Sequence, residues 1–99
     1  MVLYEVTLVL ADEAAADELE TFMRGRHIPH IFATGCFTDV RFCRMERGRY
    51  RTVYAAAKQQ DLDRYVDHHA PGLRADFDAH APAGLTVTRE VWDVVERWG

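Results

Sequence analysis

The sequence predicts an α+β domain with the element order βαββαβ. Four segments are rich in β-branched and aromatic residues, two others repeat apolar residues at helical spacing, and the segments follow one another in that order. This is the order of the ferredoxin-like split βαβ unit, in which a four-stranded antiparallel sheet carries two helices on one face. At 99 residues, the chain has the length of one domain, residues 1–99.

The first half of the chain opens with a predicted strand, Val2–Leu10. Asp12 is expected to cap the helix that follows, because its carboxylate can accept hydrogen bonds from the free amides of the first turn. Apolar residues then recur at helical spacing: Ala15, Leu19, Phe22 and Met23. The helix is expected to break at Pro29, which has no N–H, and to end with Gly35 as its C-terminal cap.

The second half repeats this pattern after a hairpin. Residues 36–47 and 50–58 are predicted to form paired strands joined at Gly48. Asp61 is expected to cap a second helix that breaks at Pro71. The apolar stripe of this helix has six members: Leu62, Tyr65, Val66, His69, Leu73 and Phe77. Residues 85–98 are predicted as the last strand. A helix is the competing interpretation there, and the valines and tryptophans of the segment disfavour it.

Composition and charge limit the classes of function and of partner that are expected for this chain. Hydrophobic residues make up 48% of the chain and charged residues 28%, which is typical of a folded globular protein. The net charge of −4 argues against nucleic acid as the main partner. No stretch has the length and apolarity of a membrane span, and the N-terminus lacks signal-peptide features, so a cytoplasmic location is expected. No phosphate-binding glycine loop or paired metal-ligand motif is present, and neither a cofactor nor a metal is predicted.

The two cysteines, Cys36 and Cys43, are expected to lie on opposite faces of one strand. Seven residues of extended chain hold them about 23 Å apart, too far for a disulfide. They are expected to be small buried hydrophobic residues.

Both faces of the predicted sheet carry apolar residues. The first strand places Tyr4 and Leu8 on one side and Leu3 on the other, and in the second strand Phe42 opposes Cys43. Helices cover only one face of such a sheet, so the other face needs a second cover. We therefore expect a homodimer that closes sheet to sheet.

A histidine precedes a proline break in both helices, in the segments RGRHIPHIF and VDHHAPGLR. Each proline frees the carbonyl four residues back, to which a nearby histidine can donate one ring nitrogen while presenting the other elsewhere. At 100° per residue, His69 lies near the centre of its apolar stripe and His27 near the edge of its own. Both are candidate catalytic residues for acid–base chemistry. The alternative is that both rings only satisfy the local backbone.

Two tyrosines and an arginine complete the predicted site. Tyr4 and Tyr54 can face one pocket from neighbouring strands, with Tyr54 as a catalytic and Tyr4 as a ligand-binding candidate, because phenol hydroxyls can donate to a carbonyl or oxyanion. Core packing is the alternative for both. Arg41 is a candidate ligand-binding residue for a carboxylate if its strand face lines the interior of a dimer. A salt bridge between subunits with Asp39 is the alternative for Arg41. Arginines near Gly48 are expected to be solvated.

The run HIPHIFATGCF, followed by GRYRTVYAA and LDRYVDHHAPGLRADF, resembles an uncharacterised bacterial family within the dimeric α/β-barrel superfamily. The resemblance covers nearly the whole chain. It implies a ferredoxin-like protomer and a homodimer, and it supplies no catalytic residues. The wider superfamily includes cofactor-independent quinone-forming monooxygenases, haem-degrading enzymes, small-lactone isomerases and amino-acid-sensing domains.

The leading functional hypothesis is therefore a homodimeric protein that binds a small molecule in a pocket between helices and sheet. One alternative is a cofactor-independent enzyme that performs monooxygenase-like or isomerase-like acid–base chemistry on an aromatic or carbonyl compound. The other alternative is a structural or interaction module. The expected partners are a second copy of the chain and a small molecule, and neither nucleic acid nor membrane.

Overall fold

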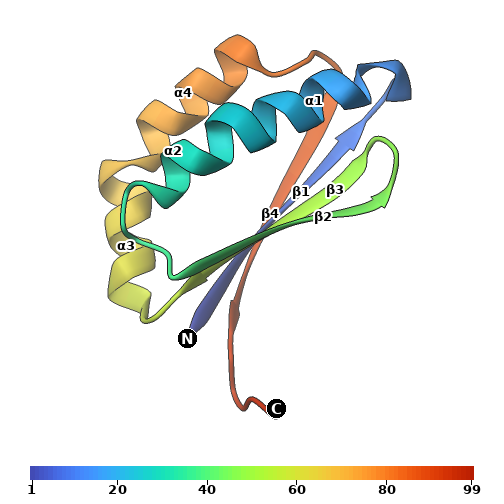
Figure 1. The fold of residues 1–99 in the computed structure, drawn as a ribbon. Coiled ribbons are helices and arrows are strands. Elements are labelled where there is room, and N and C mark those ends of the chain that lie inside the picture. Colours follow the sequence, from blue (N-terminus) through green and yellow to red (C-terminus); the bar gives the residue numbers. More distant parts are fainter.

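A four-stranded antiparallel sheet with the strand order β2-β3-β1-β4 forms one layer of the structure, and the helices form the other (Figure 1). The computed structural model describes the whole chain, residues 1–99. The elements in chain order are β1 (Val2–Leu10), the 3₁₀ turn η1 (Glu13–Ala15), α1 (Ala16–Phe22), the π-helical turn η2 (Met23–His27), α2 (Ile28–Phe32), β2 (Asp39–Glu46), β3 (Arg49–Ala56), α3 (Gln59–His68), α4 (Ala70–His80) and β4 (Leu85–Asp93). The predicted ferredoxin-like fold is confirmed. None of these helices combines the length and the apolarity needed to cross a lipid bilayer.

The core lies between the sheet and the helices. Alternate residues of β1 point toward the helices, as the two-residue repeat of a strand requires. The buried side chains form two clusters, one around Tyr4 and Tyr54 and one around Leu8 and Tyr50. Val6 packs against both clusters, so the two meet at the middle of β1.

The first helical segment continues through its predicted break. Asp12 caps it as predicted, with Oδ1 accepting a hydrogen bond from the Ala14 amide at 2.9 Å. The turn η2 is a π turn in which the amide of Ile28 donates to the carbonyl of Met23. Pro29 follows in the first turn of α2, and because it has no N–H it donates no hydrogen bond to the helical turn before it. The predicted break is therefore a widened turn within one helical course (Figure 1).

The second helical segment does break, two residues before the predicted break at Pro71, and the break consists of one residue, His69. This residue has φ −119° and ψ −40°, and α4 restarts immediately after it with Pro71 in its first turn. The prediction that Asp61 caps α3 is wrong. The amide of Asp61 already bonds to the carbonyl of Lys58 at 3.1 Å, so the helix begins two residues earlier, at Gln59.

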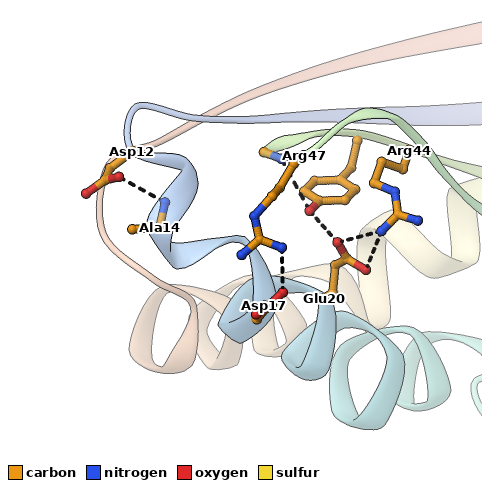
Figure 2. A network of polar contacts seen from close by, with 8 residues as sticks. Asp12, Ala14, Asp17, Glu20, Arg44 and Arg47 are labelled. Carbon is orange, nitrogen blue, oxygen red and sulfur yellow. Dashed lines mark hydrogen bonds and ion pairs between the residues drawn. The ribbon is translucent and has the colours of Figure 1, made fainter.

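A polar network joins α1 to the β2–β3 hairpin (Figure 2). The Tyr50 hydroxyl donates to Glu20 Oε2 at 2.6 Å, and Arg44 Nη1 donates to both Glu20 oxygens at 3.1 Å. These bonds hold the pKa of Glu20 below its ordinary value. Arg47 donates to Asp17 at 2.7 Å. Two of the arginines near the hairpin tip are thus paired with α1 and not merely solvated.

Several predicted strand limits change. The strand β2 begins at Asp39, so Cys36 precedes it in a loop, where it is buried. Cys43 is exposed, which corrects the expectation that both cysteines are buried, because it lies on the face of the sheet that no helix covers. Both thiols are free, as predicted. The last strand ends at Asp93, five residues earlier than predicted.

The open face of the sheet is mixed and not apolar. One cross-strand row runs Arg41, Val53, Glu5, Glu90, from β2 through β3 and β1 to β4. The next row contains Arg51 opposite Cys43. Leu3, Met45 and Trp92 supply apolar area on the same face. The expectation of two apolar faces is corrected accordingly, because the charged residues of different strands line up only once the strand order is known.

Candidate functional site

A small cavity lies where the two core clusters meet, between the helices and β1, β3 and β4. Six of its lining residues carry a polar group and come from six elements: Tyr4, His27, Tyr54, Tyr65, Arg74 and Arg89. The other lining residues are apolar, among them Met23 and Phe77. Water has access to about 30 Å³ of this space, which is room for roughly two water molecules.

Three tyrosines form the aromatic wall of the cavity. Tyr4 and Tyr54 are direct cross-strand partners, with ring centroids 5.7 Å apart. Tyr65 reaches the same place from α3, its ring 6.1 Å from that of Tyr4. Burial raises the pKa of Tyr54 and of Tyr65 above the ordinary value for a phenol. Their hydroxyls are therefore protonated at neutral pH and available as hydrogen-bond donors.

His27 reaches the cavity from the end of the π turn. Its ring stacks on Phe22, with centroids 5.7 Å apart, and lies 5.0 Å from the ring of Phe77. Burial among these rings lowers the pKa of His27 to about 4, so the imidazole is neutral at pH 7. Its Nδ1 atom is buried and has no hydrogen-bond partner. A neutral ring with an unpaired nitrogen can accept a hydrogen bond or a proton.

Two arginines missed by the sequence reasoning line the same cavity. Arg74 comes from α4, and its Nη2 donates to the Tyr4 hydroxyl at 3.5 Å. Arg89 comes from β4, where it follows Leu85 and Val87 in the row that faces the helices. A charged residue in an otherwise apolar inward row is a sequence signal that identifies Arg89. No comparable signal marks Arg74, whose position depends on the break at His69.

Two predicted site residues lie elsewhere. His69 is at the junction of α3 and α4 and does not line the cavity, because the break there ends the helical stripe on which its predicted direction relied. Arg41 lies on the open face of the sheet, opposite to the side of Tyr4, and its Nε donates to Asp39 Oδ2 at 3.0 Å. The structure thus brings together Tyr4, Tyr54 and His27 of the predicted set. No three His, Cys, Asp or Glu side chains are grouped as metal ligands.

The family of the chain follows from a match over nearly its whole length. The profile of a domain of unknown function, DUF4286, matches residues 1–95. The chain belongs to this family. No curated protein has a sequence that matches this DUF4286 chain.

Solved structures share the fold at low sequence identity. SnoaB, a cofactor-independent oxygenase from Streptomyces nogalater, is similar with a TM-score of 0.76 and 13% identity, over 97% of this chain and 94% of that chain. A dimeric ferredoxin-like protein from an uncultured marine organism has a TM-score of 0.64 and 12% identity, over 99% and 98%. A variant of MhuD with two manganese protoporphyrin IX molecules bound per active site has a TM-score of 0.69 and 17% identity, over 98% of both chains. These similarities confirm the predicted relation to the dimeric α/β barrels at the level of the fold.

Proposed function

We propose that this DUF4286 protein binds a small molecule with an apolar body in the cavity of each protomer. The observation that carries the proposal is the buried, unpaired Nδ1 of His27 at a cavity walled by tyrosines. A buried polar atom without a partner is costly, and a ligand that supplies its hydrogen bond removes that cost. Structural neighbours whose names include an oxygenase and a porphyrin-bound protein support a small-molecule role.

Entry of a ligand requires movement at the mouth of the cavity. The enclosed space holds only water-sized molecules, whereas Arg74 and Arg89 are exposed and long. Rotation of these two side chains opens the cavity at little cost in packing, since neither is held by an ion pair. The tyrosines and Met23 are buried and form the fixed wall.

Nuclear magnetic resonance with labelled histidine and tyrosine side chains tests this proposal directly. A library of aromatic fragments is expected to shift the signals of His27, Tyr4 and Tyr54. Tyr50 provides the internal control, because it is equally buried but belongs to the other cluster and does not line the cavity. If no fragment shifts the cavity signals, or if all shifts fall on residues outside the cavity, the binding proposal is wrong and a structural role is favoured.

A second candidate function rests on the unpaired ring nitrogen of His27 at the cavity. An imidazole that is neutral at pH 7 can take a proton from an acidic C–H or O–H of the ligand, and the Tyr54 hydroxyl can donate a hydrogen bond to the oxygen that gains negative charge. This is acid–base chemistry without a cofactor. The bound fragments are therefore incubated in D₂O, where the wild type is expected to exchange an acidic carbon-bound hydrogen of the ligand for deuterium. His27→Gln is expected to abolish exchange while binding persists. Exchange that is unchanged in this variant excludes His27 as the base.

We also propose that two copies pack through the open faces of their sheets. Arg41 and Arg51 lie on the β2–β3 half of this face together with one acidic residue, Asp39, and Glu5 and Glu90 lie on the β1–β4 half. A twofold axis parallel to the strands lays each half over the opposite half of the partner, which brings unlike charges together. A groove of about 880 Å³ on this face, lined by Leu3 among others, supplies area to cover. Sedimentation at micromolar concentration is expected to give a dimer, and a monomer there contradicts the proposal.

A further inference from the structure

The mouth of the cavity carries two positive charges and no negative one. None of the residues that line it is an aspartate or a glutamate, and His27 is neutral. Arg74 and Arg89 therefore give the site a charge of +2 in a protein whose net charge is −4. A site whose sign is opposite to that of the whole molecule concentrates ligands of the complementary charge.

These two arginines differ from most others in the chain. Six arginines form ion pairs with acidic side chains: Arg26, Arg41, Arg44, Arg47, Arg51 and Arg64. Neither Arg74 nor Arg89 does. The single polar contact of Arg74 is the long one of 3.5 Å to the Tyr4 hydroxyl. A guanidinium has five N–H donors, so almost all the donor capacity at the mouth is free for a ligand.

The position of Arg89 has a second explanation, which alone is insufficient. Because β4 is an edge strand, an inward-pointing charge on it also discourages pairing with a foreign strand. That explanation does not extend to Arg74, which lies on α4 and converges on the same cavity from the helical layer. Two consecutive elements, one in the helical layer and one in the sheet, thus deliver the same chemical group to one place.

We infer that the ligand of this cavity is an aromatic anion, whose carboxylate or equivalent oxyanion binds Arg74 and Arg89 while its ring packs on the tyrosine wall. This inference rests on the proposed binding function and specifies its substrate class. Guanidinium groups hold planar oxyanions through paired hydrogen bonds, and the rings of Tyr4 and Tyr65, 6.1 Å apart, offer faces and edges to a planar body.

Matched pairs of fragments test the charge requirement. The probes are 2-naphthoate and 2-naphthamide, which have the same size and shape and differ in charge. Affinity is measured by titration of the Tyr4 and His27 signals in the 99-residue protein. The carboxylate is expected to bind about tenfold more tightly than the amide, the effect of one charge-assisted hydrogen-bond pair. Arg74→Gln and Arg89→Gln are each expected to weaken carboxylate binding by about fivefold to tenfold and to weaken amide binding less, because the amide oxygen accepts only a neutral hydrogen bond.

Arg24→Gln is the matched control, because Arg24 is exposed, forms no ion pair and does not line the cavity. It removes the same charge and is expected to leave both affinities unchanged. Equal binding of amide and carboxylate at the cavity overturns the inference and leaves the proposed function intact. A carboxylate preference that survives in both cavity variants also overturns it. If neither probe nor any other aromatic fragment shifts the cavity signals, the proposed function fails together with the inference.

Discussion

His27 shows how one residue combines burial with an unmet hydrogen bond. Its ring is packed between Phe22 and Phe77, which favours the neutral form, and its Nδ1 has no partner. Packing alone does not account for a polar ring at this point, because a leucine would fill similar space without the unpaired atom. A ligand that supplies the missing hydrogen bond removes the free-energy cost of this buried, unpaired nitrogen.

The low pKa of His27 predicts a dependence of stability on pH. The folded state holds its pKa at about 4, whereas the ordinary value is 6.5, so between these values only the unfolded chain binds the proton. Stability contributed by His27 is present above pH 6.5 and is lost as the pH falls toward 4. The loss is on the order of 2 kcal/mol after allowance for the partial exposure of the ring.

Urea unfolding at a series of pH values between 4.5 and 6.5 measures this loss. Carboxylates such as Glu20 also titrate at the acid end of this window, so the contribution of His27 is taken from the difference in slope between wild type and variant. His27→Leu is expected to flatten the slope, whereas His68→Leu, at an exposed position, is expected to leave it unchanged. An equal slope in wild type and His27→Leu would mean that His27 is not the group responsible.

Tyr50 contributes to stability through its hydroxyl. The ring is buried, and the hydroxyl donates to Glu20 at 2.6 Å while accepting from the Gly48 amide at 3.3 Å. Tyr50→Phe keeps the ring but removes both bonds, and we expect it to lower the free energy of unfolding by about 1.5 kcal/mol. Chemical denaturation is the measurement. Tyr65→Phe is the control, since Tyr65 is also a buried residue at the cavity but its hydroxyl is not among the buried unpaired polar atoms and forms no hydrogen bond within the chain, and the loss of stability is expected to be smaller.

At the residue scale, the sequence predicts which way the side chains of a strand point, because that direction alternates from one residue to the next. Tyr4 and Tyr54 meet because both point to the same side of neighbouring strands, which parity and strand order determine. His69 was misplaced because a helical projection assumes a continuous helix, and the chain departs from helical geometry at that residue. Arg74 was missed for the same reason, since its direction depends on that departure.

At the scale of elements, the π turn brings four side chains to one face. Leu19, Met23, His27 and Ile31 are spaced four residues apart, and all face the sheet. In an α-helix each such step turns the face by about 40°. Three steps would turn Ile31 about 120° away from Leu19. The π turn has more residues per turn, and it therefore reverses roughly 70° of this rotation around the helix axis. It moves His27 from the predicted edge of the stripe into the cavity.

Replacement of glycine by alanine is predicted to change the free energy of unfolding in opposite directions at two positions of this helical segment. Gly25 lies within the π turn, whereas Gly35 follows the segment with φ +74°, and an added Cβ meets nothing within 4 Å at either site. Gly25→Ala is expected to raise the free energy of unfolding by about 0.5–1 kcal/mol, because alanine loses less backbone entropy in a helix. Gly35→Ala is expected to lower it by about 1 kcal/mol, because alanine is strained at positive φ. Thermal unfolding of both variants measures the two signs. Equal signs would contradict the backbone argument.

The sequence predicted the elements better than their limits. Apolar repeats identified the strands and both helical segments, because burial of one face is what those repeats encode. The capping residue Asp12 was identified from its type and place, but Asp61 was not a cap, since the backbone amide of the same residue already has a partner in Lys58. A π turn leaves no comparable signal, because it depends on how far the helix must rotate to meet the sheet.

At the scale of the whole molecule, the open face carries information that no single strand contains. Glu5 and Glu90 become neighbours only because β1 and β4 pair in this register, and Arg41 joins the same row through β3. The sequence indicated a face in need of a partner, but the division of charge between its halves required the strand order. That division favours one relative orientation of two copies over others, because like charges opposed across an interface are costly.

Substitution at Glu90 tests this arrangement. Glu90→Lys places a positive charge where the partner is expected to present Arg41 and Arg51, and it should weaken dimerisation by about tenfold or more. Glu90→Gln removes the charge but keeps an acceptor for the Trp92 indole, which donates to Glu90 at 3.1 Å, and it should have a smaller effect. Glu18→Lys makes the same charge change on α1, on the other side of the molecule, and should have no effect on dimerisation.

The dissociation constants of these dimers are measured by analytical ultracentrifugation at low and high salt. Added salt should weaken the wild-type dimer more than the Glu90→Lys dimer, because it screens an attraction in the first and a repulsion in the second. If the variants at positions 90 and 18 weaken the dimer equally, net charge and not the open face controls association.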